Sequence, residues 1–124
     1  CSDETAISIE DYNCIISVNS RILELQVKNR GLFNLEGFYI RVSDSTNTPT
    51  IMLRPADIDL GLVVQPGRYD FLSTLKPSET TTIRFDYGSD LTTIKRIQLQ
   101  PIVLGSKNQT LLCPNIADIN LENC

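Results

Sequence analysis

The chain has 124 residues, a net charge of −4 and an isoelectric point of about 4.7. Its length fits one domain spanning residues 1–124, and its acidity argues against nucleic-acid binding, because such proteins carry a basic stripe. The chain contains no histidine and no tryptophan. The missing histidine excludes Ser-His-Asp and Cys-His catalysis and every His-ligated metal site, and the missing tryptophan removes the best stacking platform for sugars and cations.

Composition favours strands over helices. Alanine, the best helix former, occurs only at Ala6, Ala56 and Ala117, whereas the β-branched residues Ile, Val and Thr are abundant. About a third of the residues are Leu, Ile, Val or Phe, which is enough to build a core. No apolar run approaches the ~18 residues of a membrane-spanning helix. The chain opens at Cys1 rather than Met, so we expect that an upstream segment has been removed.

Alternation of apolar and polar residues predicts the first strands. Residues 7–10 and 14–18 alternate in opposite phase, which predicts a bulge or break near 11–13. Asn19-Ser20 is a turn signal, residues 23–28 alternate cleanly, and Asn29-Arg30-Gly31 ends that strand.

The pattern weakens in the middle of the chain. A clean strand at 38–43 is followed by a polar loop at 44–49, and short strands are possible at 50–53 and 60–64. Lys76-Pro77-Ser78-Glu79 is the next strong turn signal.

Strand signals return in the last third. Residues 82–87 alternate cleanly, and 97–104 form a strand that contains Pro101. Because proline cannot donate to a ladder, this strand is expected to lie at a sheet edge or to bend there. Segments 111–113 and 116–121 supply the last strand. Seven to nine short strands separated by frequent turn signals predict an all-β, antiparallel sandwich.

The cleanest alternations also predict which side chains face the inside. Their apolar phase gives an inter-sheet core of Leu25, Val27, Phe38, Ile40, Ile83, Phe85, Ile97 and Leu99. Tyr87 shares the core phase of Phe85. Tyr39 points to the opposite face together with Arg41, and this pair is the candidate interface anchor.

Four cysteines lie near the two ends of the chain, at Cys1, Cys14, Cys113 and Cys124. No C-x-x-C pair occurs, which argues against a zinc site or a redox motif. The residue numbers of Cys1 and Cys124 add up to nearly the same value as those of Cys14 and Cys113, as they would if the two chain ends paired antiparallel. This favours a nested pairing, with Cys14–Cys113 inside and Cys1–Cys124 outside. The local pairing Cys1–Cys14 with Cys113–Cys124 stays open, as do four free thiols and a lipid-bearing Cys1. Disulfides would place the protein outside the cytoplasm.

Three segments resemble a known family: residues 25–42, residues 75–79 leading into 82–87, and residues 94–102. The first reads strand, Asn29-x-Gly31, Gly37-Phe38, strand, which is similar to the opening of extracellular Ig-like domains of the CARDB type. The second resembles the Leu-x-Pro-Gly-Glu turn of that family, with Ser78 in place of glycine, a change that a type I turn would accept. The third, with its flanking cysteines, resembles secreted archaeal domains of pilin-like and other cell-surface proteins. The resemblance covers about residues 20–113 and implies an Ig-like sandwich without catalytic residues.

Candidate sites are few. Asn108-Gln109-Thr110 is an N-glycosylation sequon in an expected turn. Asp57 and Asp59, with Asp70 nearby, carry the hard oxygen ligands that calcium prefers but lack the glycine and glutamate of an EF-hand loop. Carboxylates such as Asp86 and Asp90 have no spacing that would make them a glycosidase pair. We therefore expect no catalytic residue, metal or cofactor.

These features favour a non-enzymatic module outside the cell, a disulfide-stapled Ig-like sandwich that serves as a subunit of a cell-surface filament or surface layer. We expect self-assembly through edge strands, with the terminal strands at sheet edges and residues 1–10 reaching into the next subunit. Only four lysines are available to protect edges. The alternative is an adhesin or ligand-binding domain with a cell-surface or glycan partner, using loops at 44–50 or 54–70.

Overall fold

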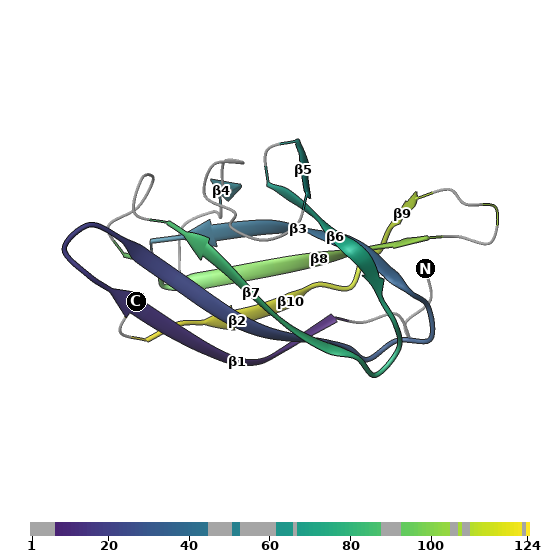
Figure 1. Cartoon of the computed structure of the whole chain (residues 1–124), viewed down its shortest axis with the longest axis horizontal. Coiled ribbons are helices and arrows are strands. Elements are labelled where there is room, and N and C mark those ends of the chain that lie inside the picture. Colours follow the sequence, from purple (N-terminus) through teal and green to yellow (C-terminus); the bar gives the residue numbers. More distant parts are fainter. Residues whose placement is uncertain are drawn as a thin grey trace.

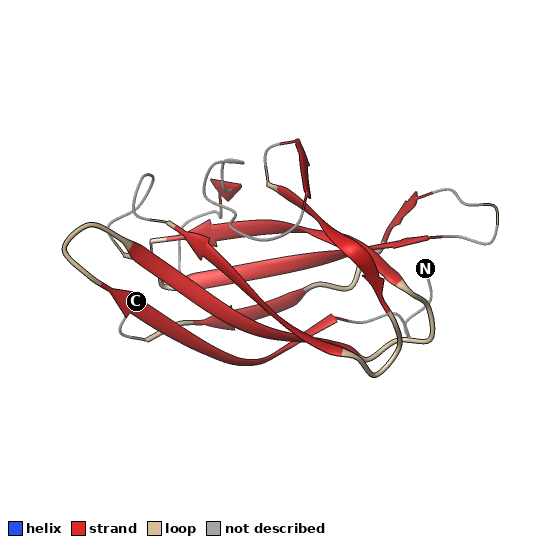
Figure 2. Ribbon diagram, viewed as in Figure 1, coloured by secondary structure: helices blue, strands red, loops and turns tan. Residues whose placement is uncertain are grey.

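The chain folds as a two-layered β-sandwich (Figures 1 and 2). The structure is a computed structural model that describes residues 7–44, 51–52, 62–65, 67–87, 93–104, 107, 110–122 and 124. The strands within this part of the chain are β1 (Ile7–Ile16), β2 (Arg21–Asn29), β3 (Leu35–Ser43), β4 (Ile51–Met52), β5 (Leu62–Gln65), β6 (Arg68–Leu75), β7 (Thr80–Asp86), β8 (Arg96–Leu104), β9 (Thr110–Leu112) and β10 (Ala117–Asn120). Without the two-residue β4 there are nine, within the expected range, and no helix occurs in the described residues.

The strand order is that of an Ig-like domain. One sheet has the order β1-β2-β7, and the other has β10-β8-β3-β6-β5, with β4 on β3 and β9 on β8. All pairings are antiparallel. The first and last strands thus fall in opposite sheets, as in immunoglobulin folds. The predicted all-β, antiparallel sandwich is confirmed, and no helix in the described part of the chain is long and apolar enough to cross a membrane.

The core lies between the sheets and matches the predicted side chains. All eight predicted core residues are at most 1% exposed, and Tyr87 is buried with them. Leu25 lies opposite Ile83, and Leu23 lies opposite Phe85. In the other sheet, the Phe38 ring stacks on Tyr69 with 5.0 Å between ring centroids, and Phe71 packs edge-on against both. The alternation therefore identified the buried face of every long strand tested.

Two irregularities in the ladders are visible in the sequence. The register of β1 against β2 shifts between Ile9 and Asp11, next to the place where a change of phase predicts a bulge. Pro101 lies in β8, which is a central strand, so of the two expected alternatives, an edge position or a bend, the edge position is wrong. The Pro101 carbonyl accepts from Cys113 N at 3.0 Å, at the gap where the neighbour of β8 changes from β10 to β9. Because N and O of one residue point to the same side of a strand, the missing N–H faces this gap in the ladder.

The disulfide pairing differs from the expected one. Cys14 in β1 is bonded to Cys124, with 5.4 Å between the Cα atoms, so neither Cys14–Cys113 nor Cys1–Cys124 forms, and the local pairing is wrong as well. Cys113 is also disulfide-bonded, and Cys1 lies outside the described residues. The expected nesting assumed that the two ends run antiparallel. Instead β1 and β10 run in the same direction along one side of the sandwich (Figure 1). Between the two chain ends, Glu122 N donates to Tyr12 Oη at 3.1 Å.

Asn29 ties together the two turns at the end of β2 and before β7. Its buried side chain donates to Phe33 O at 2.8 Å and to Leu75 O at 2.9 Å, and it accepts from Gly31 N at 2.9 Å. Its backbone donates to Glu79 O and accepts from Ser78 N. The Asn29-x-Gly31 motif and the turn at 76–79 thus meet in space.

The turn at 76–79 is not of type I. Glu79 N donates to Lys76 O at 3.0 Å, and Ser78, the third residue of the turn, has φ of 70°. A positive φ at that position defines a type II turn, which favours glycine, and Pro77 occupies the second position that proline prefers. Gly37 meets a second steric requirement, since a Cβ there would lie 2.1 Å from Tyr69 O.

Candidate interaction edges

Tyr39 and Arg41, the expected interface anchors, lie on the outer face of β3 and are partly buried. Arg41 Nη2 donates to Gln100 Oε1 on β8 at 2.9 Å. In the strand register Tyr39 lies between Arg68 on β6 and Gln100. Both side chains are therefore part of a polar network on their own sheet, and their use by a partner stays a prediction.

The same face continues toward β10 as a charged cluster. Arg96 donates to both carboxylate oxygens of Asp118, at 2.9 and 2.6 Å, and Gln98 Nε2 donates to the same carboxylate at 3.0 Å. The hydrogen bond from Arg96 holds the pKa of the Asp118 carboxyl below its usual range. Charges on this face thus satisfy one another across strands.

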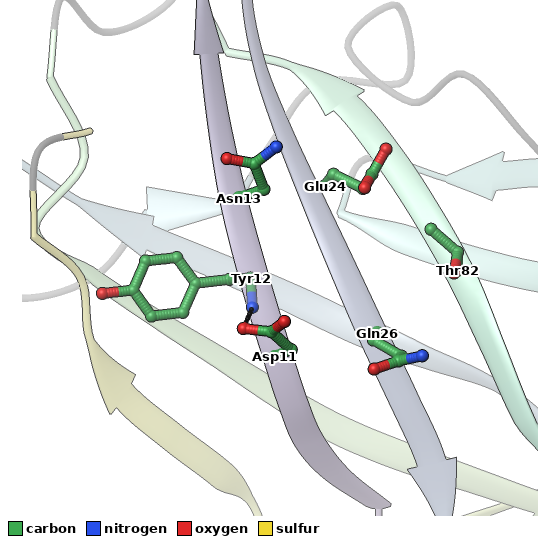
Figure 3. Close-up of a pocket in the computed structure, with 6 residues that line it drawn as sticks. All are labelled: Asp11, Tyr12, Asn13, Glu24, Gln26 and Thr82. Atoms are coloured by element: carbon green, nitrogen blue, oxygen red, sulfur yellow. Dashed lines mark hydrogen bonds between the residues drawn. The ribbon is translucent and has the colours of Figure 1, made fainter.

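A shallow polar hollow of about 150 Å³ lies on the outer face of the other sheet (Figure 3). Asn13 and Asp11 on β1 face Glu24 and Gln26 on β2, and Thr82 on β7 completes the lining. Tyr12 also lines the hollow, but its ring turns away from Glu24, Gln26 and Thr82 in Figure 3, and its hydroxyl accepts from Glu122 N. The hollow therefore offers oxygen and amide groups without an aromatic stacking surface.

A second hollow, of about 660 Å³, opens beside the Cys14–Cys124 bridge, where Ile16, Arg21, Lys95 and Glu122 contribute to its lining. It is mixed in character, with apolar and charged side chains of both signs. Within the described residues no group of three or more His, Cys, Asp or Glu is placed to hold a metal ion.

Several sequence candidates lie elsewhere. Asn108 of the sequon, Asp57, Asp59 and Asp90 fall outside the described residues, as do most of the loops at 44–50 and 54–70. Asp70, the third calcium candidate, is paired with Arg68 at 2.9 Å.

The sheet edges distinguish one strand from the others. The expected position of the terminal strands at edges is confirmed, since β1 and β10 each end a sheet. Residues 7–10 are already paired with β2, so this part of the expected connector is built into its own domain. Within the part of the chain that the structure describes, six strands have an edge position or a short pairing at a sheet margin: β1, β4, β5, β7, β9 and β10.

Five of these six strands carry features that natural proteins use against edge-to-edge pairing. β4, β5, β9 and β10 are two to four residues long, and β5 has a shifted register as well. β1 is longer but carries the bulge after Ile9 and is linked to the C-terminus by Cys14–Cys124.

β7 has none of these features. It is seven residues long, its register against β2 is unbroken from Thr80 to Asp86, and it contains no proline and no lysine. Within the described part of the chain it pairs with β2 alone. Among the side chains of β7 that the structure describes, only Arg84 is charged. Its Nε donates to Glu24 Oε2 on β2 at 2.7 Å, so the guanidinium group is directed toward its own sheet. Among the described residues, β7 is therefore the edge strand that lacks this protection.

The backbone groups on this edge follow from the ladder. Tyr87 N donates to Arg21 O, so odd-numbered residues of β7 direct their N–H and C=O groups toward β2. The even-numbered residues, Thr80, Thr82, Arg84 and Asp86, direct theirs away from the sheet. Sequence reasoning missed this edge because edge and central strands show the same alternation. The available signal was the lysine distribution, since none of the four lysines lies in an edge strand.

Comparisons with known proteins give no relative: no family model, no curated protein and no solved structure matches the chain.

Proposed function

We propose that this protein is an extracellular structural module, a subunit of a cell-surface filament or surface layer, which assembles by adding a strand from another chain to the free edge of β7. The observation that carries the proposal is the contrast between β7 and the other edge strands. The four even-numbered residues of β7 each direct one N–H donor and one C=O acceptor toward a neighbouring strand, and strand addition to such an edge is a common mode of protein recognition.

The proposal also includes an extracellular location and membership of the CARDB-type family. The Cys14–Cys124 bridge and the bonded state of Cys113 fit an oxidising compartment. The Asn29-x-Gly31 and Pro77 turns, which carry the resemblance to CARDB-type domains of archaeal surface proteins, support membership of that family. Asn108 is the proposed glycosylation site, and no enzymatic activity is proposed.

Proline substitution tests the use of the β7 edge. Thr82→Pro removes an N–H that faces away from β2, so the intramolecular ladder stays complete, and proline is tolerated at such edge positions. We expect the natural chain to form oligomers or fibres as its concentration rises, detected by sedimentation velocity and negative-stain microscopy. Thr82→Pro should remain a folded monomer.

Gln26→Lys is the matched control, because it changes the same outer face on the central strand β2. It should assemble like the natural chain. If Thr82→Pro assembles equally well, or if the natural chain stays monomeric at every concentration, the proposal is wrong. Deleting residues 1–10 is a poorer test, since residues 7–10 form part of β1.

The alternative function, ligand binding or adhesion, has one observation in its favour, the polar hollow lined by Asp11, Asn13, Glu24, Gln26 and Thr82. Amides and carboxylates of this kind bind sugar hydroxyls. A monomeric chain whose Asn13 and Gln26 amide resonances shift on titration with neutral monosaccharides would favour this function over assembly.

A further inference from the structure

We propose that the strand added to β7 is β7 of a second copy, paired antiparallel about a two-fold axis that passes beside Ile83. This inference rests on the proposed function and specifies its partner and register. It would join two three-stranded sheets into one continuous six-stranded sheet of order β1-β2-β7-β7-β2-β1.

The direction of the backbone groups limits the possible registers. In an antiparallel pair, residues whose N–H and C=O groups point at the partner must lie opposite each other. On β7 these are the even-numbered residues, so a two-fold pairing can be centred on Thr82, Ile83 or Arg84. Centring on Ile83 matches Thr80 with Asp86 and Thr82 with Arg84, in both directions. All four outward residues are then paired over the full length of the strand.

The other two registers leave backbone groups unpaired. Centring on Thr82 pairs Thr80, Thr82 and Arg84 but sets Asp86 opposite Ser78 in the turn at 76–79, where Ser78 N is already bonded to Asn29 O. Centring on Arg84 sets Thr80 opposite position 88, beyond the end of β7 at Asp86. An unpaired N–H or C=O that loses contact with water costs about 1–3 kcal/mol, so the register on Ile83 is the most favourable.

The charge of Arg84 also favours the register centred on Ile83. Centring on Arg84 would set two guanidinium groups directly opposite each other, which is destabilising in a sheet. With Ile83 at the centre, Arg84 lies opposite the partner's Thr82 and keeps its bond to Glu24 on its own β2. The outer face of the joint therefore contains no opposed like charges among the described side chains.

The symmetry of the contact has a consequence for assembly. A two-fold contact uses the same surface on both copies and closes on itself. The dimer leaves no free β7 edge, so a filament would be built from dimers that meet through other surfaces.

Cysteine cross-linking measures the register. Residues opposite each other in a hydrogen-bonded pair have Cα atoms about 5.5 Å apart, within the range for a disulfide, whereas diagonal neighbours lie beyond it. We would prepare the full chain as Thr82→Cys and as Arg84→Cys, oxidise each alone and as an equal mixture, and identify the linked peptides by mass spectrometry. Gln26→Cys, on the outer face of β2, is the control and should not cross-link.

The register on Ile83 predicts that only the mixture yields a dimer, linked between positions 82 and 84. Cross-linking of Thr82→Cys alone would move the centre to residue 82, and cross-linking of Arg84→Cys alone would move it to residue 84; either result overturns this register. If no sample cross-links while Thr82→Pro still abolishes assembly, the proposed function stands and the self-pairing of β7 is wrong. If Thr82→Pro also assembles normally, both fail.

Discussion

Replacing Asn29 with Asp tests how the two turns are held together. The two side chains have almost the same shape, and aspartate keeps the oxygen that accepts from Gly31 N. It replaces the amide that donates to Phe33 O at 2.8 Å and Leu75 O at 2.9 Å with a second oxygen. A carboxylate at this fully buried position would face two carbonyl oxygens without a donor between them.

The magnitude depends on pH, and its sign follows from the burial of the charge. Burial and the two facing carbonyls raise the pKa of a carboxyl in the folded state above its unfolded value of about 3.9. Below that value the acid is protonated in both states and can donate to one carbonyl, so the loss should be about 1–3 kcal/mol, for the one carbonyl left unpaired. As the pH rises toward the folded pKa, the variant should lose a further ~1.4 kcal/mol per pH unit relative to the natural chain.

Urea unfolding at several pH values measures this difference. Far-UV circular dichroism and tyrosine fluorescence are suitable probes, since the chain has no tryptophan. Asn34→Asp is the control, because it adds the same charge at an exposed position in the same loop, and its effect should stay within about 0.5 kcal/mol. If Asn29→Asp destabilises the fold equally at pH 4 and pH 7, or no more than Asn34→Asp does, the role assigned to the Asn29 amide is wrong.

Three further predictions concern stability. Ser78→Gly should stabilise the fold by about 0.5–1 kcal/mol in urea unfolding, because glycine adopts the φ of 70° without a Cβ penalty; a loss of stability would contradict the type II turn. Phe85→Ala should cost about 3–5 kcal/mol, whereas Arg84→Ala should cost at most about 1 kcal/mol, since one side chain is fully buried and the other forms an exposed ion pair; the reverse order would refute the strand register. Non-reducing peptide mapping should recover Cys14 linked to Cys124, and replacing both with serine should cost about 4–5 kcal/mol; recovery of Cys14 linked to Cys113 would refute the pairing.

Strand content and core were predictable because they depend on local periodicity. The alternating segments around Leu25, Phe38, Phe85 and Leu99 each have one apolar face, and a pleated strand can bury only one such face. No knowledge of the strand order was needed for that conclusion.

The disulfide pairing was not predictable by the same means, since it depends on how distant strands are oriented. Cysteine pairs whose residue numbers add up to nearly the same value indicate bridges only when the two segments run antiparallel. The ends of β1 and β10 run in the same direction, so the second cysteine near the N-terminus bonds to the second cysteine near the C-terminus. The turn at Ser78 illustrates a similar limit, because the sequence marks the turn but not the sign of φ within it. The free edge of β7 depends in the same way on the topology of the whole sheet.

The Cys14–Cys124 bridge also determines how the domain responds to tension. A pulling force applied at Cys124 enters the first strand directly through the covalent bond, and the chain between these cysteines, 110 positions apart, forms a closed loop that carries none of the load. Of the described residues, only 7–13 lie outside this loop, and seven residues extend to roughly 25 Å at most. While the bridge is oxidised, the described part of the chain therefore acts as a nearly inextensible link, and reduction would let the load unravel the strands that the bridge shields.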